Sequence, residues 1–275
     1  MTVHHLDCAT FCPYGGRLLV GSGGRVVGRM VGHCLLVERA DGLVLVDTGF
    51  GTADVADPLR LGRGLLLAAR PQLTLRRTAL HQVRALGFDP RDVRDIVVTH
   101  LDPDHAGGLG DFPEARVHVL AAELRAARDP ATRLERSRYR AVQWSHGPRW
   151  TEYAAGGEQW FGFEAVRLLP GAGPEVLLVP LTGHTHGHSG VAVRDGERWL
   201  LHCGDAYFSA ADLAPELLRR PPALRTYQQL MAVDDKARQR NQQRLRELRR
   251  DHGDLVRPLC AHDAEDFTHL AAGRG

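Results

Sequence analysis

The sequence contains little cysteine, few aromatic residues and no long apolar run. Its five cysteines are widely spaced along 275 residues, a pattern that excludes the disulfide-rich frameworks of small secreted proteins. No apolar stretch approaches the length of a membrane-spanning helix, and residues 1–10 lack the apolar segment of a signal peptide. We therefore expect a cytoplasmic protein with reduced thiols and no contact with a membrane.

A strong excess of charge of either sign is also absent. The chain has 35 Lys and Arg residues against 33 Asp and Glu residues, and its formal net charge is +2 at pH 7. Because the basic residues are spread along the chain among acidic ones, we expect no nucleic-acid partner. The most basic stretch, residues 236–250, fits the solvent-facing side of a helix better than a docking site for an acidic partner. A small-molecule substrate is the expected partner, and the sequence leaves a homodimer open.

The length and an apolar fraction of 43% suit a single domain that covers residues 1–275. Helices are predicted over residues 54–87, 121–128 and 223–250, and Leu230 is placed on the buried side of the last. Short apolar runs predict strands over residues 33–38, 43–46, 95–99, 116–120, 165–169, 176–180, 190–194, 198–202 and 256–260.

The most informative stretch is residues 99–108. It contains four side chains of metal-ligating type within six positions: His100, Asp102, Asp104 and His105. An apolar run precedes them and Gly107-Gly108 follows, so a rigid strand would present a ligand-rich loop. Imidazole nitrogen and carboxylate oxygen suit zinc, iron or manganese. Such a loop favours a metal site over an ordinary polar turn.

The same arrangement, an apolar run that ends in a polar side chain, recurs along the chain. Asp47 follows the run at 43–46, and its carboxylate either caps the next turn or belongs to the site. His184, Asp205 and His262 follow later runs, at Gly183-His184-Thr185, Gly204-Asp205 and His262-Asp263. The pattern predicts that these residues belong to the same site as the loop at residues 99–108.

Taken together and in this order, the motifs resemble those of the metallo-β-lactamase superfamily. The resemblance extends over nearly the whole chain and implies an α+β fold. The expected architecture is an αββα four-layer sandwich, in which two mixed β-sheets pack face to face with helices outside. Within the superfamily the chain is most similar to dinuclear hydrolases such as the acyl-homoserine lactone lactonases and glyoxalase II.

The resemblance implies two divalent metal ions that share the carboxylate of Asp205. The first ion would be bound by His100, Asp102 and His184. The second would be bound by Asp104, His105 and His262. Asp47 would hold a ligand histidine through its other ring nitrogen. His186 and His188 are not expected to be ligands. Zinc is the first expectation, with manganese or iron as alternatives.

The implied activity is hydrolysis of an ester, lactone or thioester carbonyl by a hydroxide that bridges the metals. Asp104, Asp205 and Tyr207 are the candidate catalytic residues, with Asp104 or Tyr207 as the acid that protonates the leaving group. The alternatives are a redox enzyme with a di-iron site, a phosphodiesterase of the same fold, and a binding protein without turnover. Flavodiiron proteins are usually fused to a flavin-binding domain, for which the sequence shows no segment.

Two positions depart from the family pattern. Asp102 stands where the usual motif has a second histidine, and Phe208 stands where the lactonases have a tyrosine, with Tyr207 one residue earlier. Two divalent ions would be balanced by one hydroxide and three carboxylates, whereas histidine at position 102 would leave one positive charge. Asp102→His is therefore expected to move the acidic limb of the pH–rate profile to lower pH and to favour zinc.

Residues 129–163 show no regular pattern but contain three of the four tryptophans. This excursion is either a wall or lid over a pocket or a small local core, and the local core is favoured for most of its aromatic residues. Trp150 and Tyr153 are the candidates for contact with an apolar substrate. Arg149 is the candidate for binding a substrate carboxylate.

Overall fold

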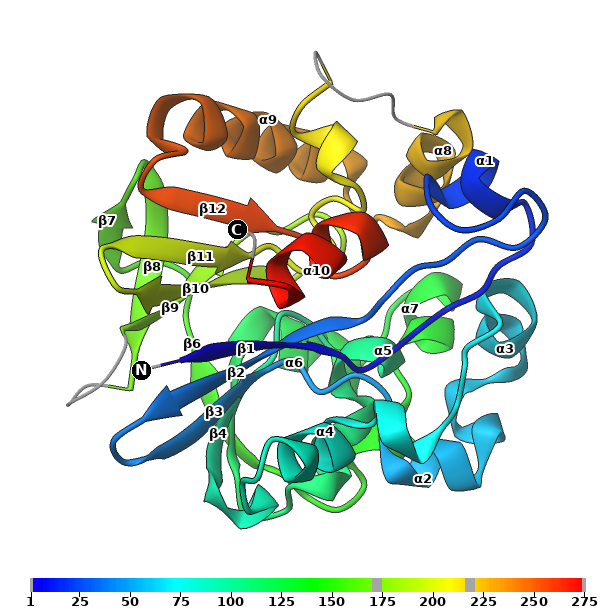
Figure 1. Ribbon diagram of the computed structural model, residues 1–275, viewed down its shortest axis with the longest axis horizontal. Coiled ribbons are helices and arrows are strands. Elements are labelled where there is room, and N and C mark those ends of the chain that lie inside the picture. Colours follow the sequence, from blue (N-terminus) through cyan, green and yellow to red (C-terminus); the bar gives the residue numbers. More distant parts are fainter. Residues whose placement is uncertain (1, 170–174, 216–220, 274–275) are drawn as a thin grey trace.

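The computed structural model describes residues 2–169, 175–215 and 221–273 (Figure 1). Twelve strands in these ranges form two six-stranded sheets. None of the helices described is long and apolar enough to cross a membrane.

The first sheet is built from the strands in their order along the chain. It contains β1 (Val3–Asp7), β2 (His33–Arg39), β3 (Gly42–Val46), β4 (Val93–Val97), β5 (Arg116–Leu120) and β6 (Arg149–Tyr153). β1, β2 and β3 pair antiparallel, and β3 to β6 pair parallel. The sheet is therefore mixed, as expected.

The second sheet is likewise built from its strands in their order along the chain. It contains β7 (Glu158–Trp160), β8 (Phe163–Leu168), β9 (Val176–Pro180), β10 (Ser189–Asp195), β11 (Arg198–His202) and β12 (Val256–Leu259). Its pairings are antiparallel except for the parallel pair β11–β12.

The alternation of side chains along central strands creates the layers. In β3, Val44 and Val46 pack between the sheets, whereas Leu43 and Leu45 pack on the outer face. In β9, Leu178 faces the other sheet, and Leu177 faces outward. A sheet that is apolar on both faces needs a cover on its outer side.

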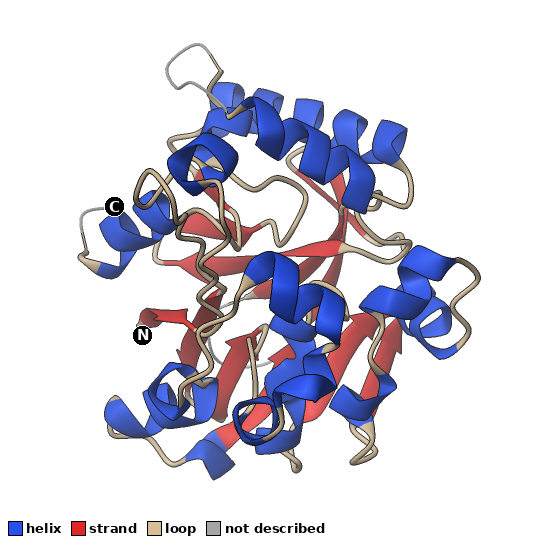
Figure 2. Cartoon of the chain, turned by 90° about the vertical axis from the view of Figure 1, so that its right-hand side faces the viewer, coloured by secondary structure: helices blue, strands red, loops and turns tan. Residues whose placement is uncertain are grey.

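Helices supply that cover on both sides (Figure 2). Val83 of α4 and Leu124 of α6 join the outer core of the first sheet, and Leu245 and Leu248 of α9 join that of the second. Figure 1 shows α9 on the side of the second sheet and α4 on the opposite side. The helices are α1 (Gly16–Val20), α2 (Thr52–Ala56), α3 (Arg63–Ala69), α4 (Ala79–Ala85), α5 (Pro103–Ala106), α6 (Ala121–Arg128), α7 (Arg133–Arg138), α8 (Pro222–Met231), α9 (Asp235–His252) and α10 (Ala264–Ala271). The predicted αββα sandwich is confirmed.

Two predicted helices are broken into shorter ones. Residues 54–87 form α2, α3 and α4, with 3₁₀ turns between them. Residues 223–250 fall on α8 and α9, because Asp234 caps α9 by accepting a hydrogen bond from the amide of Ala237. The change of direction leaves Leu230 69% exposed, so its predicted place in a buried stripe is wrong.

The excursion at residues 129–163 is more regular than its sequence suggests. It supplies α7 and two edge strands, β6 for the first sheet and β7 for the second. Trp160 lies in the outer core of the second sheet, and Trp144 and Trp150 pack against that of the first. The strands and tryptophans of the segment therefore belong to the sandwich.

The parallel strands bring the polar strand ends to one edge. Asp47 follows β3 and His100 follows β4, and these two strands run parallel. Asp205 and His262 follow β11 and β12, which also run parallel. Because the carboxyl ends of parallel strands meet at one edge of a sheet, each pair comes together. The amide of Ser189 donates to the carbonyl of Thr99 (2.9 Å), which joins the loops of the two sheets.

Candidate metal centre

Seven buried side chains converge where these loops meet. They form two groups, within each of which the ligand atoms lie within 4.8 Å of one another. One group consists of His100, Asp102, His184 and Asp205, and the other of Asp104, His105 and His262. The structure thus brings together every residue that the sequence predicts as a ligand, in the two predicted groups.

In the first group, two imidazole nitrogens face two carboxylate oxygens. Nε2 of His184 lies 3.2 Å from Oδ2 of Asp102 and 3.4 Å from Oδ2 of Asp205. Nε2 of His100 lies 3.4 Å and 3.9 Å from the same two atoms. A tetrahedral ion with ligands at about 2.0–2.1 Å separates neighbouring donor atoms by about 3.3 Å. The spacing therefore fits one metal ion.

The second group uses the other oxygen of Asp205. Oδ1 lies 3.3 Å from Nε2 of His105 and 3.0 Å from Nε2 of His262. Oδ2 of Asp104 lies 3.5 Å and 3.6 Å from the same two nitrogens. Each oxygen of Asp205 thus faces a different group, which is the arrangement that a bridging carboxylate requires.

Unpartnered polar atoms provide an independent reason to expect metal. Nε2 of His100, Nε2 of His105 and Oδ1 of Asp205 are buried without a hydrogen-bond partner in the described parts of the chain. A buried polar atom without a partner is costly, whereas one metal ion in each group would together satisfy all three. The donor set fits two divalent ions. The ligand role of each residue stays a prediction.

The far sides of the histidine rings are held by the surrounding chain. Nδ1 of His105 lies 2.8 Å from Oδ2 of Asp47, whose two oxygens also accept hydrogen bonds from the amide and hydroxyl of Thr99. Nδ1 of His262 lies 2.8 Å from the carbonyl of Val31. Such contacts fix the ring so that Nε2 points at the ligand groups. Of the two readings of Asp47, the structure favours the site.

The two other histidines of the 184–188 segment face elsewhere. Nδ1 of His188 lies 2.9 Å from the carbonyl of Leu181, and its Nε2 accepts a hydrogen bond from the amide of Asp205. His188 therefore fixes the backbone of Asp205. Nε2 of His186 lies 3.0 Å from a carboxylate oxygen of Glu135.

Glycine is required beside His188. Gly204 has φ +50°, and a Cβ there would lie 2.7 Å from Nε2 of His188. Only a residue without a side chain lets β11 turn toward Asp205 so closely beneath this ring.

Charges in the cluster separate the pKa values of its histidines. Burial lowers the pKa of His184 to about 4, with the positive charge of Arg138 as the next cause. Burial also opposes protonation of His105 and His262, but nearby carboxylates, Asp205 foremost, raise the pKa of both. Asp205 is itself kept ionised, because the charges of His262 and His105 outweigh its burial and hold its pKa well below the usual range.

Two buried charged residues near the ligands were not identified from the sequence. Glu123 of α6 accepts hydrogen bonds from the amides of Leu101 and Gly187 and from the hydroxyl of Thr185. Arg138 of α7 lies beside Asp102. Both residues lie on short helical segments rich in charge, where the sequence gives no signal that distinguishes a buried charge from an exposed one.

The aromatic residues that face the site also differ from expectation. Phe208 packs edge-to-face against His184 and His262, and the ring of Tyr227 lies 5.7 Å from that of Phe208. Tyr227 is 42% exposed. The packing around its hydroxyl, followed by the negative charge of Asp104, raises the pKa of Tyr227. Tyr227 of α8 therefore stands at the rim of the cluster.

Tyr207, the predicted acid, lies elsewhere. It is 2% exposed and belongs to the outer core of the second sheet, with Trp160 and Leu248. Burial raises the pKa of Tyr207 well above its usual range. The two neighbours lie in the turn that follows β11, and there Phe208 packs against the ligand groups whereas Tyr207 packs into the outer core.

The three predicted substrate contacts are not brought to the cluster. Arg149 is exposed at the edge of the first sheet, where it donates to the carbonyl of Glu114. Trp150 packs against the outer core of the first sheet. The hydroxyl of Tyr153 bonds His118, which bonds Asp95 in turn. Their roles as substrate contacts receive no support from these positions.

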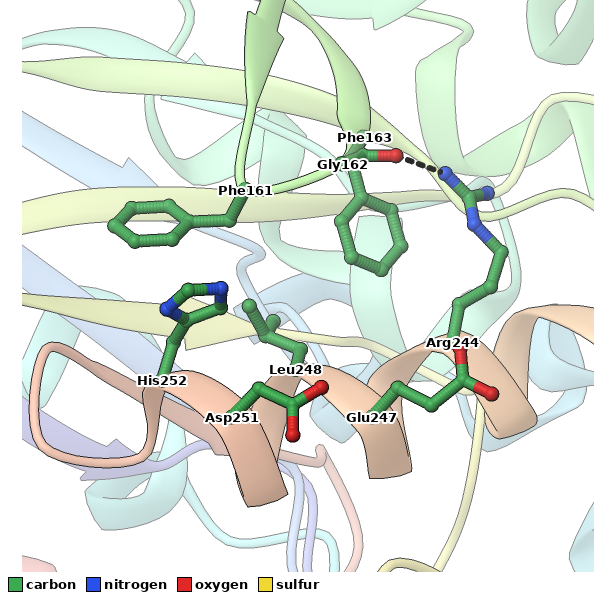
Figure 3. A pocket seen from close by; sticks show the side chains of 8 residues that line it. All are labelled: Phe161, Gly162, Phe163, Arg244, Glu247, Leu248, Asp251 and His252. Atoms are coloured by element: carbon green, nitrogen blue, oxygen red, sulfur yellow. Dashed lines mark hydrogen bonds between the residues drawn. The ribbon is translucent and has the colours of Figure 1, made fainter.

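A surface cavity of about 210 Å³ lies between α9 and the β7–β8 turn (Figure 3). Arg244 stacks over the ring of Phe163, 4.1 Å from its centre, and donates to the carbonyl of Gly162. None of the eight lining residues belongs to the ligand groups. This cavity is therefore separate from the candidate metal centre.

Comparison with known families agrees with this geometry. The sequence profile described as "Metallo-beta-lactamase superfamily" matches residues 27–249. The chain belongs to the metallo-β-lactamase superfamily. The resemblance seen in the motifs is therefore confirmed, and the superfamily's fold is the one observed.

Relatives within the superfamily include hydrolases. A protein of Mycobacterium tuberculosis named "Probable metallo-hydrolase" is 44% identical over 265 residues, which cover 96% of this chain and 80% of that protein. An N-acyl homoserine lactonase, AttM of Rhizobium johnstonii, is 37% identical over 95 residues, 34% of this chain and 36% of the lactonase.

Solved structures share the fold at low identity. A mutant of AiiA from B. thuringiensis, with N-decanoyl-L-homoserine bound at its active site, has a TM-score of 0.71 and 19% identity. The match covers 97% of this chain and 94% of AiiA. AidC, described as a dizinc quorum-quenching lactonase, has a TM-score of 0.60 and 16% identity, over 95% of this chain and 86% of AidC.

Proposed function

We propose that the protein is a dinuclear metal-dependent hydrolase that cleaves an ester, lactone or thioester. One observation carries the proposal. The two oxygens of Asp205 face two separate groups of buried donor atoms, each with the spacing of a metal site. Zinc is the first expectation, because four histidines contribute and AidC is described as dizinc. Manganese or iron is the alternative, because three carboxylates are hard ligands.

When bound, two divalent ions supply an activated water as nucleophile and polarise the carbonyl that it attacks. The protein's own contribution is to fix the donors in advance. Asp47 orients His105, and His188 holds the amide of Asp205. Burial of both groups excludes bulk water, which strengthens every electrostatic interaction within the site.

The rim of the cluster supports an acyl substrate with an apolar portion. Phe208 covers His184 and His262 with an apolar ring, and Tyr227 beside it offers a hydroxyl. That hydroxyl can donate a hydrogen bond to the oxygen of the leaving group. Lactones with an acyl chain combine these features, and several relatives are named N-acyl homoserine lactonases.

Elemental analysis and a substrate screen test the proposal together. We expect about two metal ions per chain after gentle purification, and turnover of members of a lactone, thioester and aryl ester panel. Phosphodiesters serve as the contrasting class. A preference for phosphodiesters over every acyl substrate, or less than about one metal ion per chain, would contradict the proposal.

A further inference from the structure

Arg138 is a buried arginine that contacts the first ligand group without belonging to it. It is the last residue of α7 and is 4% exposed. Its Nη1 donates to the carbonyl of His184 (2.8 Å), and its Nη2 donates to the carbonyl of Met231 at the end of α8. Its Nε lies 3.4 Å from Oδ1 of Asp102. The guanidinium thus joins three segments of the chain beside one metal position.

The two oxygens of Asp102 have different surroundings. Oδ2 faces His100 and His184, whereas Oδ1 faces Arg138. Oδ1 of Asp102 and Nε of Arg138 have no hydrogen-bond partner among the described residues, so each is the other's charged neighbour. A carboxylate that is held at one oxygen keeps its other oxygen directed at a metal position.

The charge of Arg138 changes the balance at the centre. Three carboxylates and one hydroxide would balance the charge of two divalent ions. Compared with a centre that has histidine at position 102, the centre with Asp102 would therefore carry one positive charge less. A guanidinium remains protonated in proteins, and Arg138 is buried within the same cluster. Asp102 together with Arg138 therefore gives the same total charge as a histidine at position 102 without the arginine.

The helix that carries Arg138 is itself fixed to the ligand loop. Thr132 and Glu135 form a capping box at the start of α7. The other oxygen of Glu135 lies 3.0 Å from Nε2 of His186. Glu135 and Arg138 are three residues apart and so lie on one face of the helix. Both contact the segment that contains His184, which holds α7 against the metal centre.

We propose that Arg138 is a positioning residue of the metal centre, which orients Asp102 toward the first metal position and offsets its charge. The proposal rests on the metal centre described above. It concerns an arginine that is not a ligand, and it treats Asp102 and Arg138 as one unit that replaces a single histidine.

Cobalt binding tests the joint role of Asp102 and Arg138 without any substrate. Metal-free protein is titrated with Co²⁺, and the visible absorption of the bound ion reports its ligands and its affinity. The variants are Asp102→His, the double variant Asp102→His/Arg138→Met, and the control Asp102→His/Arg136→Met. Arg136 lies on the same helix but is exposed.

We expect Asp102→His alone to weaken the first cobalt site roughly tenfold or more, because the buried guanidinium then faces an imidazole and a metal ion. Adding Arg138→Met should restore the affinity to within about threefold of the wild type, because the charge balance returns. Adding Arg136→Met should restore nothing. Equal cobalt affinities of Asp102→His and Asp102→His/Arg138→Met would overturn the proposal.

A second measurement covers the case in which Asp102→His does not fold. Arg138→Met should change the cobalt spectrum at the first site, because Asp102 is no longer held, whereas Arg138→Lys, which keeps the charge, should change it less. A spectrum unchanged in Arg138→Met would overturn the proposal. A wild-type chain that binds two cobalt ions but hydrolyses none of the substrates would contradict the proposed function and leave this measurement valid.

Discussion

Tyr207 and Tyr227 have opposite surroundings, and this difference decides which hydroxyl can act. Tyr207 is buried in the outer core of the second sheet, whereas Tyr227 packs on Phe208 at the rim of the ligand groups. We expect Tyr227→Phe to lower kcat roughly tenfold or more with bound metal unchanged, because a donor to the leaving group is lost. Tyr207→Phe is the matched control and should leave kcat within about twofold. Equal effects of the two changes would remove the proposed role of Tyr227.

The three histidines of the 184–188 segment are expected to differ in their effect on bound metal. His184→Ala should release one metal ion per chain, because its Nε2 faces both Asp102 and Asp205. His186→Ala should release none, because its ring is 57% exposed and pairs with Glu135. His188→Ala should keep most bound metal and weaken its retention, because only the amide of Asp205 is released. Elemental analysis after dialysis checks this order, and equal loss in all three variants would refute it.

At the level of elements, Glu123 joins the two ligand loops through α6. Its carboxylate accepts hydrogen bonds from Leu101 in one loop and from Thr185 and Gly187 in the other. Glutamine offers only one accepting oxygen, so Glu123→Gln leaves buried donors unpaired. We expect unfolding in urea to show a loss of about 2–4 kcal/mol, together with faster loss of the first metal ion to a chelator.

Glu152→Gln is the matched control for that change. Glu152 is exposed and lies 3.4 Å from Arg128 in a surface ion pair. Surface pairs contribute about 0–1 kcal/mol, so this variant should keep both its stability and its metal ions. If the two variants behave alike, Glu123 does not couple the loops.

The central strands could be predicted because each carries its own signal. The runs around Leu45, Ile96 and Leu178 are apolar on both faces and end in turn residues. The edge strands β1, β6 and β7 could not be predicted, since their sequences, VHHLD, RWTEY and EQW, alternate weakly and few of their residues are buried.

The same distinction holds within the site. The candidate ligands could be predicted because their spacing is local: His100, Asp102, Asp104 and His105 lie within six positions. Arg138 could not, because its role depends on the tertiary packing that brings α7 to Asp102. The place of Tyr207 could not be predicted for a related reason, since the direction of its side chain depends on the turn that follows β11.

For the whole molecule, two buried histidines and one half-buried histidine lie at the junction of the two sheets. Nδ1 of His5 on β1 lies 2.8 Å from Nε2 of His33 on β2, whose carbonyl lies 2.6 Å from Nε2 of His202 on β11. Burial lowers the pKa of His5 to about 4 and holds the pKa of His33 well below its usual range. Burial also lowers the pKa of His202.

These directions give the sign of a pH dependence. Histidines kept neutral in the fold become protonated in the unfolded chain once the pH falls below about 6.5. Their contribution to stability is therefore complete above that pH and is lost as the pH falls toward 4. The measurement is the unfolding temperature of metal-free protein between pH 7 and about pH 4. We expect this temperature to fall less steeply with pH in His202→Gln than in the wild type, whereas His269→Gln, which changes an exposed residue, should behave as the wild type. If the unfolding temperature falls equally with pH in the wild type and in both variants, His202 does not contribute to this pH dependence.

The order of the strands has a consequence for assembly from separate polypeptides. Each sheet is continuous in sequence, from β1 to β6 and from β7 to β12. The connection between Tyr153 and Glu158 passes exposed alanines at 154 and 155. A chain cleaved there would yield two pieces, one with His100 to His105 and the other with His184, Asp205 and His262. We expect the pieces to reassociate in the presence of divalent metal and to separate in chelator, as size-exclusion chromatography would measure.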